Sequence, residues 1–575
     1  MQKKKRNLII TTVIILLNLI ILKNAYCFAL NRRLLFFMGT DALVWILLWC
    51  FSNKYNILLN RLCEKICTFP FYYKNNKRRI FADLLQITFV IFFSEITSYV
   101  ISLMTNFSFN YILFSGVMCV LLVLYVTWKF RSNLYNKLHC IFFACAMICG
   151  CFYIFCMPAE VVMGWDEHIH FDNTMTIVNN IGGYSSSVDS IVMNRVYEKD
   201  SDFYSSEARI NNEDLYNSKY ESHEVGDFKN IKFGATTISY VPYAVGVIIG
   251  RGLLMSYTSA FRFGKLINLL FYCTIVTFAI SKTKNNKIIF AGLGILPTVL
   301  FMASSFSYDA WVLCFTLLGY SLYLNCIEEK SMTKSRMLQI LICFGLGILI
   351  KAVYFPIMIP LLFAPNSIFE KSSDKKKFRI GIVITMLILL LSFALPMLIN
   401  SGSQTDVRGG TDVNSAEQVK FILSNPLKYA EIYFRYLATF YLIPSHSYGF
   451  IQAYAYLGNG ITNVIPLILL IGMILFTKSD YNYSIGNTVL SWICSFISLT
   501  LVVTALYVSF TPVGLDTVNG CQFRYMIPLL YPILASTKGG YIKNGIYAGQ
   551  YGTFVIDFMA LSMIVFMTHF MLIRL

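Results

Sequence analysis

The feature that most constrains this chain is a series of long apolar runs without a charged residue, among them Leu8–Leu22, Ile380–Ile399 and Val489–Tyr507. A helix needs about 20 such residues to cross the hydrocarbon core of a bilayer. Because lipid cannot hydrogen-bond an exposed backbone, only helices and closed barrels span it. Barrel strands alternate apolar and polar residues, and these runs do not. The sequence therefore predicts an all-α polytopic membrane protein.

Composition agrees, since only 13% of the 575 residues are charged, against about 25% in soluble domains. The formal net charge of +17 could indicate a nucleic-acid partner. Basic residues in cytoplasmic loops explain it better, so we expect a lipid bilayer and no nucleic acid as partner. Most of the 16 cysteines lie inside apolar runs without metal-site spacing, which predicts small buried apolar side chains.

Hydropathy predicts a helical bundle of roughly 13–15 spans. Three shorter segments, 336–350, 352–365 and 524–536, are predicted as half-helices. The full spans are expected at 8–29, 34–51, 81–104, 110–129, 138–157, 261–281, 287–306, 308–327, 378–399, 431–447, 461–477, 486–509 and 552–573.

Loop charge predicts the orientation. Segment 52–80 carries seven Lys or Arg against one acid, which is typical of a cytoplasmic loop. Segment 158–235 holds 14 of the 30 acids against six basic residues, and we expect it to be a large external loop. The N-terminus is predicted to be cytoplasmic, with the first helix retained because no small-residue cleavage site follows it. The apolar stretch Ile238–Leu254 is predicted to lie along the outer surface rather than to span.

The external loop opens with Gly164-Trp-Asp-Glu-His-Ile-His-Phe-Asp172. On a helix, Asp166, Glu167 and His170 would be near neighbours. Such a group could act as a general base, so we take these three residues as candidate catalytic residues. The same three side chains could hold a divalent metal such as Mn or Mg. A simpler alternative is that the acids favour the helix macrodipole.

Charged residues at other predicted membrane edges are candidate binding residues, because charge is costly there. Asp309 could also be a helix N-cap, and Lys351 a lysine that reaches the interface. Arg262 and Arg524 carry the forked guanidinium that binds phosphate in a bidentate geometry. Several cations around an external acidic site would suit a phosphate-bearing lipid.

Several short motifs follow one another between about 140 and 540. They are Asp166-Glu-His-Ile-His-Phe171, Tyr240-Val-Pro-Tyr243, Arg262-Phe-Gly-Lys-Leu-Ile-Asn268, Pro297, Ser305-Phe-Ser-Tyr-Asp309, Lys351-Ala-Val-Tyr-Phe-Pro356, Asn425-Pro-Leu427 and Gln522-Phe-Arg-Tyr-Met-Ile-Pro528. Their order resembles that in the bacterial membrane proteins of the DUF2142 family, relatives of the GT-C glycosyltransferases. At one point the chain departs from the expected pattern, because Phe523 stands where a glycine is expected before Arg524.

The resemblance implies a GT-C-like bundle in a bacterial plasma membrane that moves a sugar from a polyprenyl-phosphate carrier to a glycan acceptor on the external face. It assigns the acid–histidine motif to catalysis and Asp309, Lys351, Gln522, Arg524, Tyr525 and Arg262 to the lipid phosphate or sugar. It also divides the chain into an added N-terminal block, 1–135, a core, 136–540, and a C-terminal helix, 541–575.

Two other functions stay open at this point. A transporter or flippase of polysaccharide or lipid-linked precursors would share the helices and buried charges, but would concentrate polar groups near the bilayer midplane, often in repeats. The N-terminal acids Asp41, Asp83 and Glu95 could serve such a protein as a proton relay. A non-catalytic scaffold could use the acidic loop to bind a partner.

Overall fold

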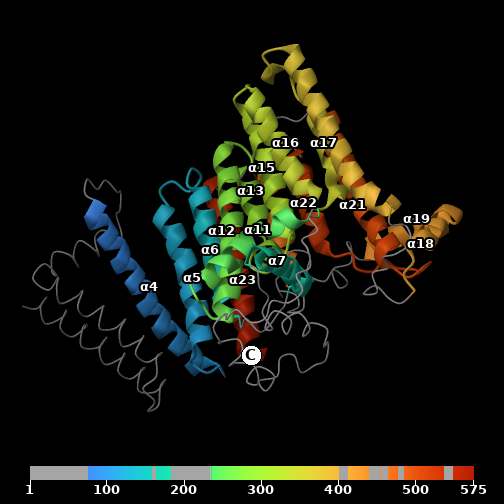
Figure 1. Cartoon of the computed structure of the whole chain (residues 1–575). Helices are drawn as coiled ribbons and strands as arrows, with labels where there is room; N and C mark the ends of the chain where they lie inside the picture. The colour runs from blue at the N-terminus through green and yellow to red at the C-terminus, as the bar shows by residue number, and fades with distance from the viewer. Residues whose placement is uncertain are drawn as a thin grey trace, which may run out of the picture. The chain divides into compact units, whose positions relative to one another are not determined.

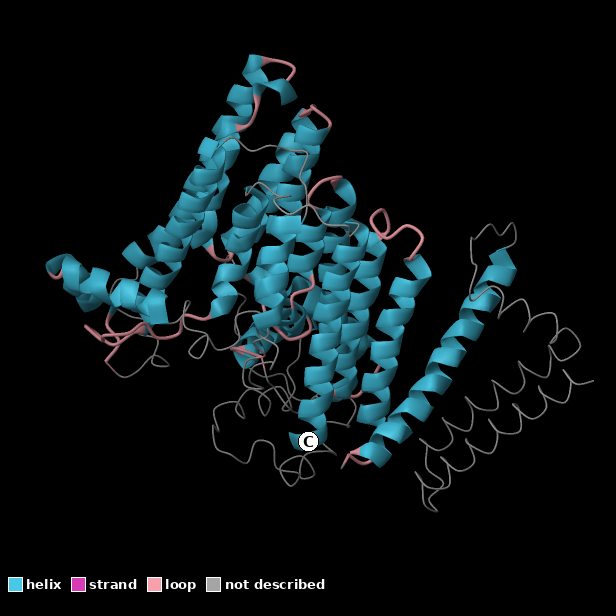
Figure 2. Ribbon diagram, turned by 180° about the vertical axis from the view of Figure 1, so that it is seen from behind, coloured by secondary structure: helices cyan, strands magenta, loops and turns pink. Residues whose placement is uncertain are grey.

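The computed structural model describes residues 76–105, 107–157, 164–182, 234, 236–399, 412–439, 454, 464–476, 485–536 and 548–574. Within these ranges Figure 2 shows helices and connecting loops and no strand. Seven of the described helices are long and apolar enough to cross a membrane. The prediction of an all-α polytopic membrane protein is confirmed. The predicted spans 8–29 and 34–51, and most of loop 158–235, lie outside the described residues.

The chain forms two units. The described helices of the smaller unit are α4 (Asn76–Met104) and α5 (Tyr111–Phe130), which pack on each other. A salt bridge of 2.9 Å joins Lys129 of α5 to Asp83 of α4, so Asp83 is paired. The end of α23 (Ala548–Arg574), from Met567 onward, also belongs to this unit. The larger unit comprises 133–566, whereas the predicted block and core boundaries stay predictions.

The centre of the larger unit is a row of neighbouring helices (Figure 1). Helix α12 packs against α6 and α15, and α15 packs against α16, which in turn contacts α17. The bounds of the helices in this unit are α6 Leu138–Cys156, α12 Tyr257–Lys282, α15 Asp309–Glu328, α16 Lys334–Leu349, α17 Ser372–Ile399, α18 Ser415–Ser424, α19 Pro426–Leu437, α20 Val464–Phe476, α21 Ile485–Phe510 and α22 Ile527–Ser536.

One predicted continuous span is wrong, and a second is described only in part. Segment 287–306 is broken into α13 (Lys287–Gly294) and α14 (Pro297–Ala303). Pro297 lacks a backbone N–H and disfavours a helical conformation at the residue before it, and Leu296 has an extended ψ of 131°. In segment 431–447, α19 starts earlier and ends as a regular helix at Leu437, and residues 440–447 lie outside the described part.

The predicted pair of half-helices at 336–365 is confirmed. Helix α16 ends at Leu349, and the chain returns as a 3-10 helix, η3 (Ala352–Phe363). Pro356 and Pro360 lie inside η3, and each removes a helical hydrogen-bond donor. At about 2.0 Å per residue, these 12 residues extend about 24 Å. Lys351 therefore stands at the turn between two antiparallel apolar segments.

The apolar stretch predicted to lie along the surface forms η2 (Thr237–Tyr240) and α11 (Val241–Gly252). Twelve residues make a helix of about 18 Å, which is too short to cross a core of about 30 Å. Helix α11 is therefore too short to span by itself, and its predicted position along the outer surface stays a prediction. Helix α11 lies directly on α12, because a Cβ added to Gly246 would come within 2.7 Å of the backbone of Gly264.

Helix α7 (Glu167–Gly182) is amphipathic and fixes the first candidate motif in place. Its apolar residues Phe171, Met175 and Val178 recur at helical spacing and are buried. They form one cluster with residues of η2, α11 and α12 and with Phe306. The Phe171 ring meets that of Phe306 edge to face, with centroids 5.1 Å apart. The motif therefore begins a helix that is packed along one side.

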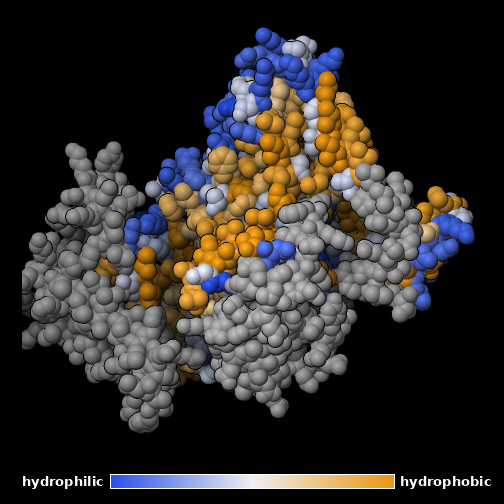
Figure 3. Space-filling model, in the orientation of Figure 1, coloured by the Kyte–Doolittle hydropathy of each residue, from blue (hydrophilic) through white to orange (hydrophobic). Residues whose placement is uncertain are grey.

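The loops at one end of the larger unit gather around Lys284. Its backbone carbonyl accepts a hydrogen bond from Tyr135, and its N–H donates to Glu328. A bond from the Met332 N–H to the Ile368 carbonyl joins two further loops there. We call this the basic end. Figure 3 shows hydrophilic residues gathered where α16 and α17 begin and an apolar surface below them. The basic residues on these loops and on the adjoining ends of the helices are Lys282, Lys284, Lys287, Lys330, Lys334, Arg336, Lys371, Lys375, Lys376, Lys377 and Arg379.

Candidate functional site

The site is built at the opposite end, where α12 and α15 begin and α16 ends. Asp166 stands in the turn just before α7 and has a left-handed backbone, with φ of 53°. Non-glycine residues rarely adopt this region, although Asp does so more often than most. Such strain often marks functional sites. This left-handed conformation places Asp166 outside the helix that Glu167 begins, so the carboxylates of these two adjacent residues contact different partners.

Glu167 is fully buried, with 0% of its side chain exposed, and its carboxylate is completely engaged. One oxygen lies 2.7 Å from the Lys265 ammonium of α12 and accepts a 3.0 Å hydrogen bond from the Phe306 N–H. The other accepts from the Gly164 N–H at 2.7 Å. A buried carboxylate needs such partners. Glu167 thereby ties the start of α7 to α12 and to the turn before α15.

The turn before α15 is held by Tyr243 of α11. The Tyr243 hydroxyl donates to the Ser305 carbonyl at 2.6 Å and accepts from the Ser307 N–H at 3.1 Å. Asn268 of α12 donates to the same hydroxyl at 2.8 Å and to the Ala303 carbonyl at 2.9 Å. These buried polar groups fix a turn that would otherwise leave backbone groups unpaired. Asp309 then begins α15.

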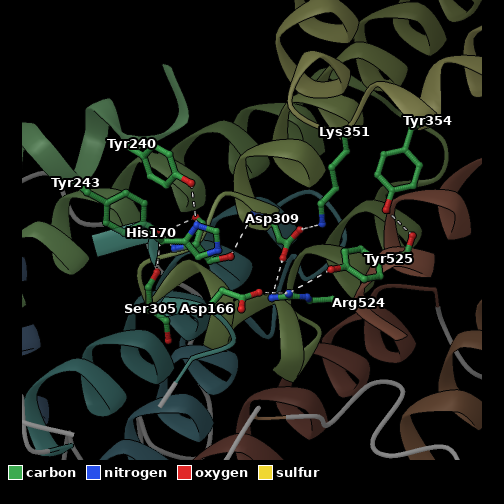
Figure 4. Close-up of polar contacts among 11 residues, drawn as sticks. Asp166, His170, Tyr240, Tyr243, Ser305, Asp309, Lys351, Tyr354, Arg524 and Tyr525 are labelled. Atoms are coloured by element: carbon green, nitrogen blue, oxygen red, sulfur yellow. Dashed lines mark hydrogen bonds and ion pairs between the residues drawn. The ribbon is translucent and has the colours of Figure 1, made fainter. Parts of the chain in front are cut away.

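Asp309 is the centre of a buried ion cluster (Figure 4). One carboxylate oxygen pairs with the Lys351 ammonium, and the other lies 3.2 Å from Nη1 of Arg524. The side chains are 7%, 11% and 3% exposed, in that order. The Lys351 ammonium also lies 4.0 Å from the centroid of the Tyr525 ring. Two cations from distant parts of the chain therefore meet on one carboxylate.

Arg524 also connects the cluster to Asp166. Its Nη2 lies 3.4 Å from an Asp166 oxygen, and the Asp166 side chain is 40% exposed, whereas that of Arg524 is 3% exposed. The guanidinium lies 4.9 Å from the Trp165 ring centroid, a cation–π contact. Within the described part of the chain, Nε of Arg524 has no hydrogen-bond partner. Asp166 is thus the member of the cluster that solvent reaches most, and the Nε–H of Arg524 remains available as a donor.

Burial sets the protonation of two groups here. It lowers the pKa of Lys351 to about 8, although the Asp309 carboxylate acts in the opposite direction. Lys351 therefore keeps its charge at neutral pH. Burial, followed by the positive charge of Arg524, also lowers the pKa of His170 below its ordinary value. The imidazole is therefore neutral, with Nδ1 2.8 Å from the Tyr240 hydroxyl.

The predicted binding residues are brought together only in part. Tyr525 lies beside Lys351 and Arg524, and its carbonyl accepts a 2.7 Å bond from Tyr354. Gln522 directly precedes η8 (Phe523–Met526), and its carbonyl accepts from the Tyr525 N–H. Arg262, however, donates to the Met157 carbonyl just beyond α6, at 3.1 Å. Phe523, at the position expected to be glycine, is buried.

The three candidate metal ligands do not fit a metal site. Asp166 pairs with Arg524, Glu167 with Lys265, and His170 with Tyr240. Across the residues that the structure describes, no group of three or more His, Cys, Asp or Glu side chains is arranged to hold an ion. Because the carboxylates of Asp166 and Glu167 are already paired with Arg524 and Lys265, we derive no step through a metal.

Several residues of the site were missed by sequence reasoning. Lys265 was assigned no role, although it lies in the same short motif as Arg262 and Asn268. Tyr243 is predicted only as part of the motif Tyr240-Val-Pro-Tyr243, and Trp165 only as the residue before Asp166, with no role for either. A lysine inside an otherwise apolar span was the available signal, because such a charge requires a partner.

Fold and site together define a polytopic α-helical membrane protein with a buried ion-pair cluster at one end of its helices. The chain belongs to the family described as predicted membrane protein (DUF2142), whose model matches residues 160–533. This match confirms the family resemblance and includes every predicted site residue from Asp166 to Tyr525. No curated protein and no solved structure matches the chain.

Proposed function

We propose that this protein is a membrane glycosyltransferase of the GT-C type. It takes a sugar from a polyprenyl-phosphate carrier and passes it to a cell-envelope glycan or another acceptor on the external face. The observation that carries the proposal is the meeting of two buried cations, Arg524 and Lys351, beside the more exposed carboxylate of Asp166.

The two cations suit a phosphate that becomes more negative during the reaction. Arg524 offers a forked guanidinium, which binds phosphate oxygens in pairs. Lys351 adds a second positive charge that burial has removed from water. Preorganised charges in such a site stabilise developing negative charge better than water does. Asp309 holds both cations in place and balances them when no substrate is bound.

Asp166 is our candidate for the general base, because its carboxylate is partly exposed and close to Arg524. It would take the proton from an acceptor hydroxyl as that oxygen bonds to the anomeric carbon of the sugar. The bond from this carbon to the carrier's phosphate oxygen breaks at the same time, and its electron pair leaves with polyprenyl phosphate. Arg524 and Lys351 would neutralise this leaving group. Glu167 then positions the turn rather than reacting, because all its oxygens are engaged.

The distribution of charge along the helices supports an external location for the cluster. Helices α12 and α15 begin at the cluster and end at the loops of the basic end. Basic loops are typical of the cytoplasmic side, which would leave the cluster on the external side. Nucleotide sugars are absent there, so a donor reached from the membrane fits this location.

The proposal is tested in cells by mass spectrometry of envelope glycans. We expect cells without the protein to lack a glycan modification, and Asp166→Asn to reproduce this loss at normal expression. Asp172→Asn is the matched control, because Asp172 is an exposed residue of α7, the helix that directly follows Asp166; it should restore the glycan. Unchanged glycans in cells that lack the protein, or full activity of Asp166→Asn, would defeat the proposal.

A further inference from the structure

An apolar groove lies between α21 and α22, with Met526 at one edge. Its volume is about 430 Å³, within the range of about 300–1,000 Å³ that is typical of ligand sites. Eight residues line it, and seven are apolar: Trp492, Ile493, Phe496, Leu499, Met526, Leu529 and Ile533. The eighth, Ser495, donates its hydroxyl hydrogen to the Ser491 carbonyl at 2.8 Å. The groove therefore offers almost no polar group to an occupant.

The lining follows the periodicity of two helices. Trp492, Phe496 and Leu499 lie on one face of α21, and Leu529 and Ile533 lie one turn apart on α22. Leu499 and Leu529 form a buried floor. Trp492 and Phe496 are about half exposed, at 50% and 49%. Because α21 is a candidate membrane span, this open side would face lipid.

Neighbouring residues of the chain link the groove to the cation cluster. Met526, at one edge of the groove, ends the same short helix η8 that carries Arg524 and Tyr525. The Tyr525 ring lies against the Lys351 ammonium. An anionic headgroup at Arg524 and Lys351 would therefore lie next to the segment, η8, whose last residue borders the apolar groove along α21 and α22. This is the charge pattern of a single lipid chain joined to a phosphate.

We infer that this groove binds the first isoprenoid units of the polyprenyl-phosphate carrier, with its phosphate at Arg524 and Lys351. The inference rests on the proposed function and adds the binding site for the tail. Branched isoprenoid units bury apolar area against the Phe496 and Leu499 side chains, and each buried carbon contributes to affinity.

The test uses the full-length protein in nanodiscs and a photoreactive long-chain polyprenyl phosphate, with a short-chain analogue for comparison. Leu499→Trp fills the floor of the groove, and Phe496→Ala removes part of its open wall with little risk to folding. Ile497→Trp is the matched control, because Ile497 is 41% exposed on the same helix and does not line the groove. Labelled peptides are identified by mass spectrometry.

We expect long-chain capture to fall about tenfold in Leu499→Trp, to fall severalfold in Phe496→Ala, and to stay unchanged in Ile497→Trp. Short-chain capture should not change, and the labelled peptides should come from α21 and α22. The inference is overturned if long-chain capture is equal in all variants, or if labels map elsewhere. It is also overturned if phosphatidic acid competes as well as unlabelled polyprenyl phosphate.

Sugar transfer measured on the same samples separates this inference from the proposed function. Transfer by the wild type with no effect of the groove variants on long-chain capture overturns the groove alone. Groove-dependent capture of the long chain without any sugar transfer overturns the proposed glycosyltransferase activity and leaves the lipid site standing.

Discussion

Arg524 and Asp309, which lie far apart in the chain, form an ion pair of 3.2 Å with almost no exposure to solvent. Isolated charges are costly to bury, and a buried pair is maintained only when its geometry and partners are good. Here Lys351 provides the second charge for the carboxylate and Asp166 the second carboxylate for the guanidinium. The four groups are electrically balanced, and only Asp166 is substantially exposed.

Removing the charge of Glu167 should destabilise the protein. Glu167→Gln leaves the Lys265 ammonium buried without its carboxylate, which costs about 3–5 kcal/mol. Thermal unfolding of the purified protein in detergent measures this loss. Glu431→Gln is the control, since Glu431 pairs with Lys428 on an exposed surface, where such pairs contribute about 0–1 kcal/mol. Wild-type stability of Glu167→Gln together with lost sugar transfer would instead give Glu167 a catalytic role.

A side chain at Gly246 should push α11 away from α12. An added Cβ would lie 2.7 Å from the Phe263 carbonyl oxygen and from the Gly264 backbone, and neither can move without shifting a helix. We expect Gly246→Ala to lower the unfolding temperature, at a cost of about 1–3 kcal/mol. Gly252→Ala should be nearly neutral, because nothing lies within 4 Å of its added Cβ. Equal stability of the two variants would contradict this packing.

Stability should fall as the pH decreases below about 6.5, the ordinary pKa of histidine. In the folded protein, burial and Arg524 lower the pKa of His170, so the unfolded chain binds a proton that the folded protein does not. Below the unfolded pKa this difference favours unfolding. His170→Gln cannot titrate and should show a shallower decrease in unfolding temperature between pH 6.5 and 5. Parallel pH profiles for the two proteins would refute the assignment.

The Trp165 ring should help to hold the Arg524 guanidinium for the phosphate. A cation–π contact contributes about 0.5–2 kcal/mol, so we expect Trp165→Leu to weaken binding of polyprenyl phosphate severalfold. Trp128→Leu is the control, because it removes a similar contact, with Arg131 at 4.4 Å, from the other unit. Binding is measured by equilibrium competition in nanodiscs. Equal affinities of the two variants would remove Trp165 from the site.

Much of the fold could be predicted from hydropathy, because a bilayer requires long apolar helices whatever their neighbours are. The break at Pro297 could not be placed in this way, since hydropathy averages over the proline that ends α13. The apolar composition of Ile238–Leu254 predicts a helix, whereas only loop charge indicated that this helix does not span. Its contact with α12 depends on Gly246 and Gly264 facing each other, which no local pattern reveals.

Most charged residues of the site were predicted, but their pairings were not. Asp309, Lys351 and Arg524 were recognisable because charges at membrane edges require a reason. The roles of Asp166 and Glu167 could not be separated, because their divergence depends on the left-handed backbone of Asp166. Lys265 was missed because its partner lies in a segment about a hundred residues earlier in the chain, and helical spacing relates only near neighbours.

The most direct test of the central claim is release of polyprenyl phosphate from a polyprenyl-phosphate-linked sugar by purified protein with an acceptor glycan. We predict release by the wild type and by Asp172→Asn, and a decrease of about 10²–10⁴-fold in Asp166→Asn, the usual contribution of a general base. Wild-type release by Asp166→Asn, or no release by the wild type from any carrier-linked sugar, would contradict the account.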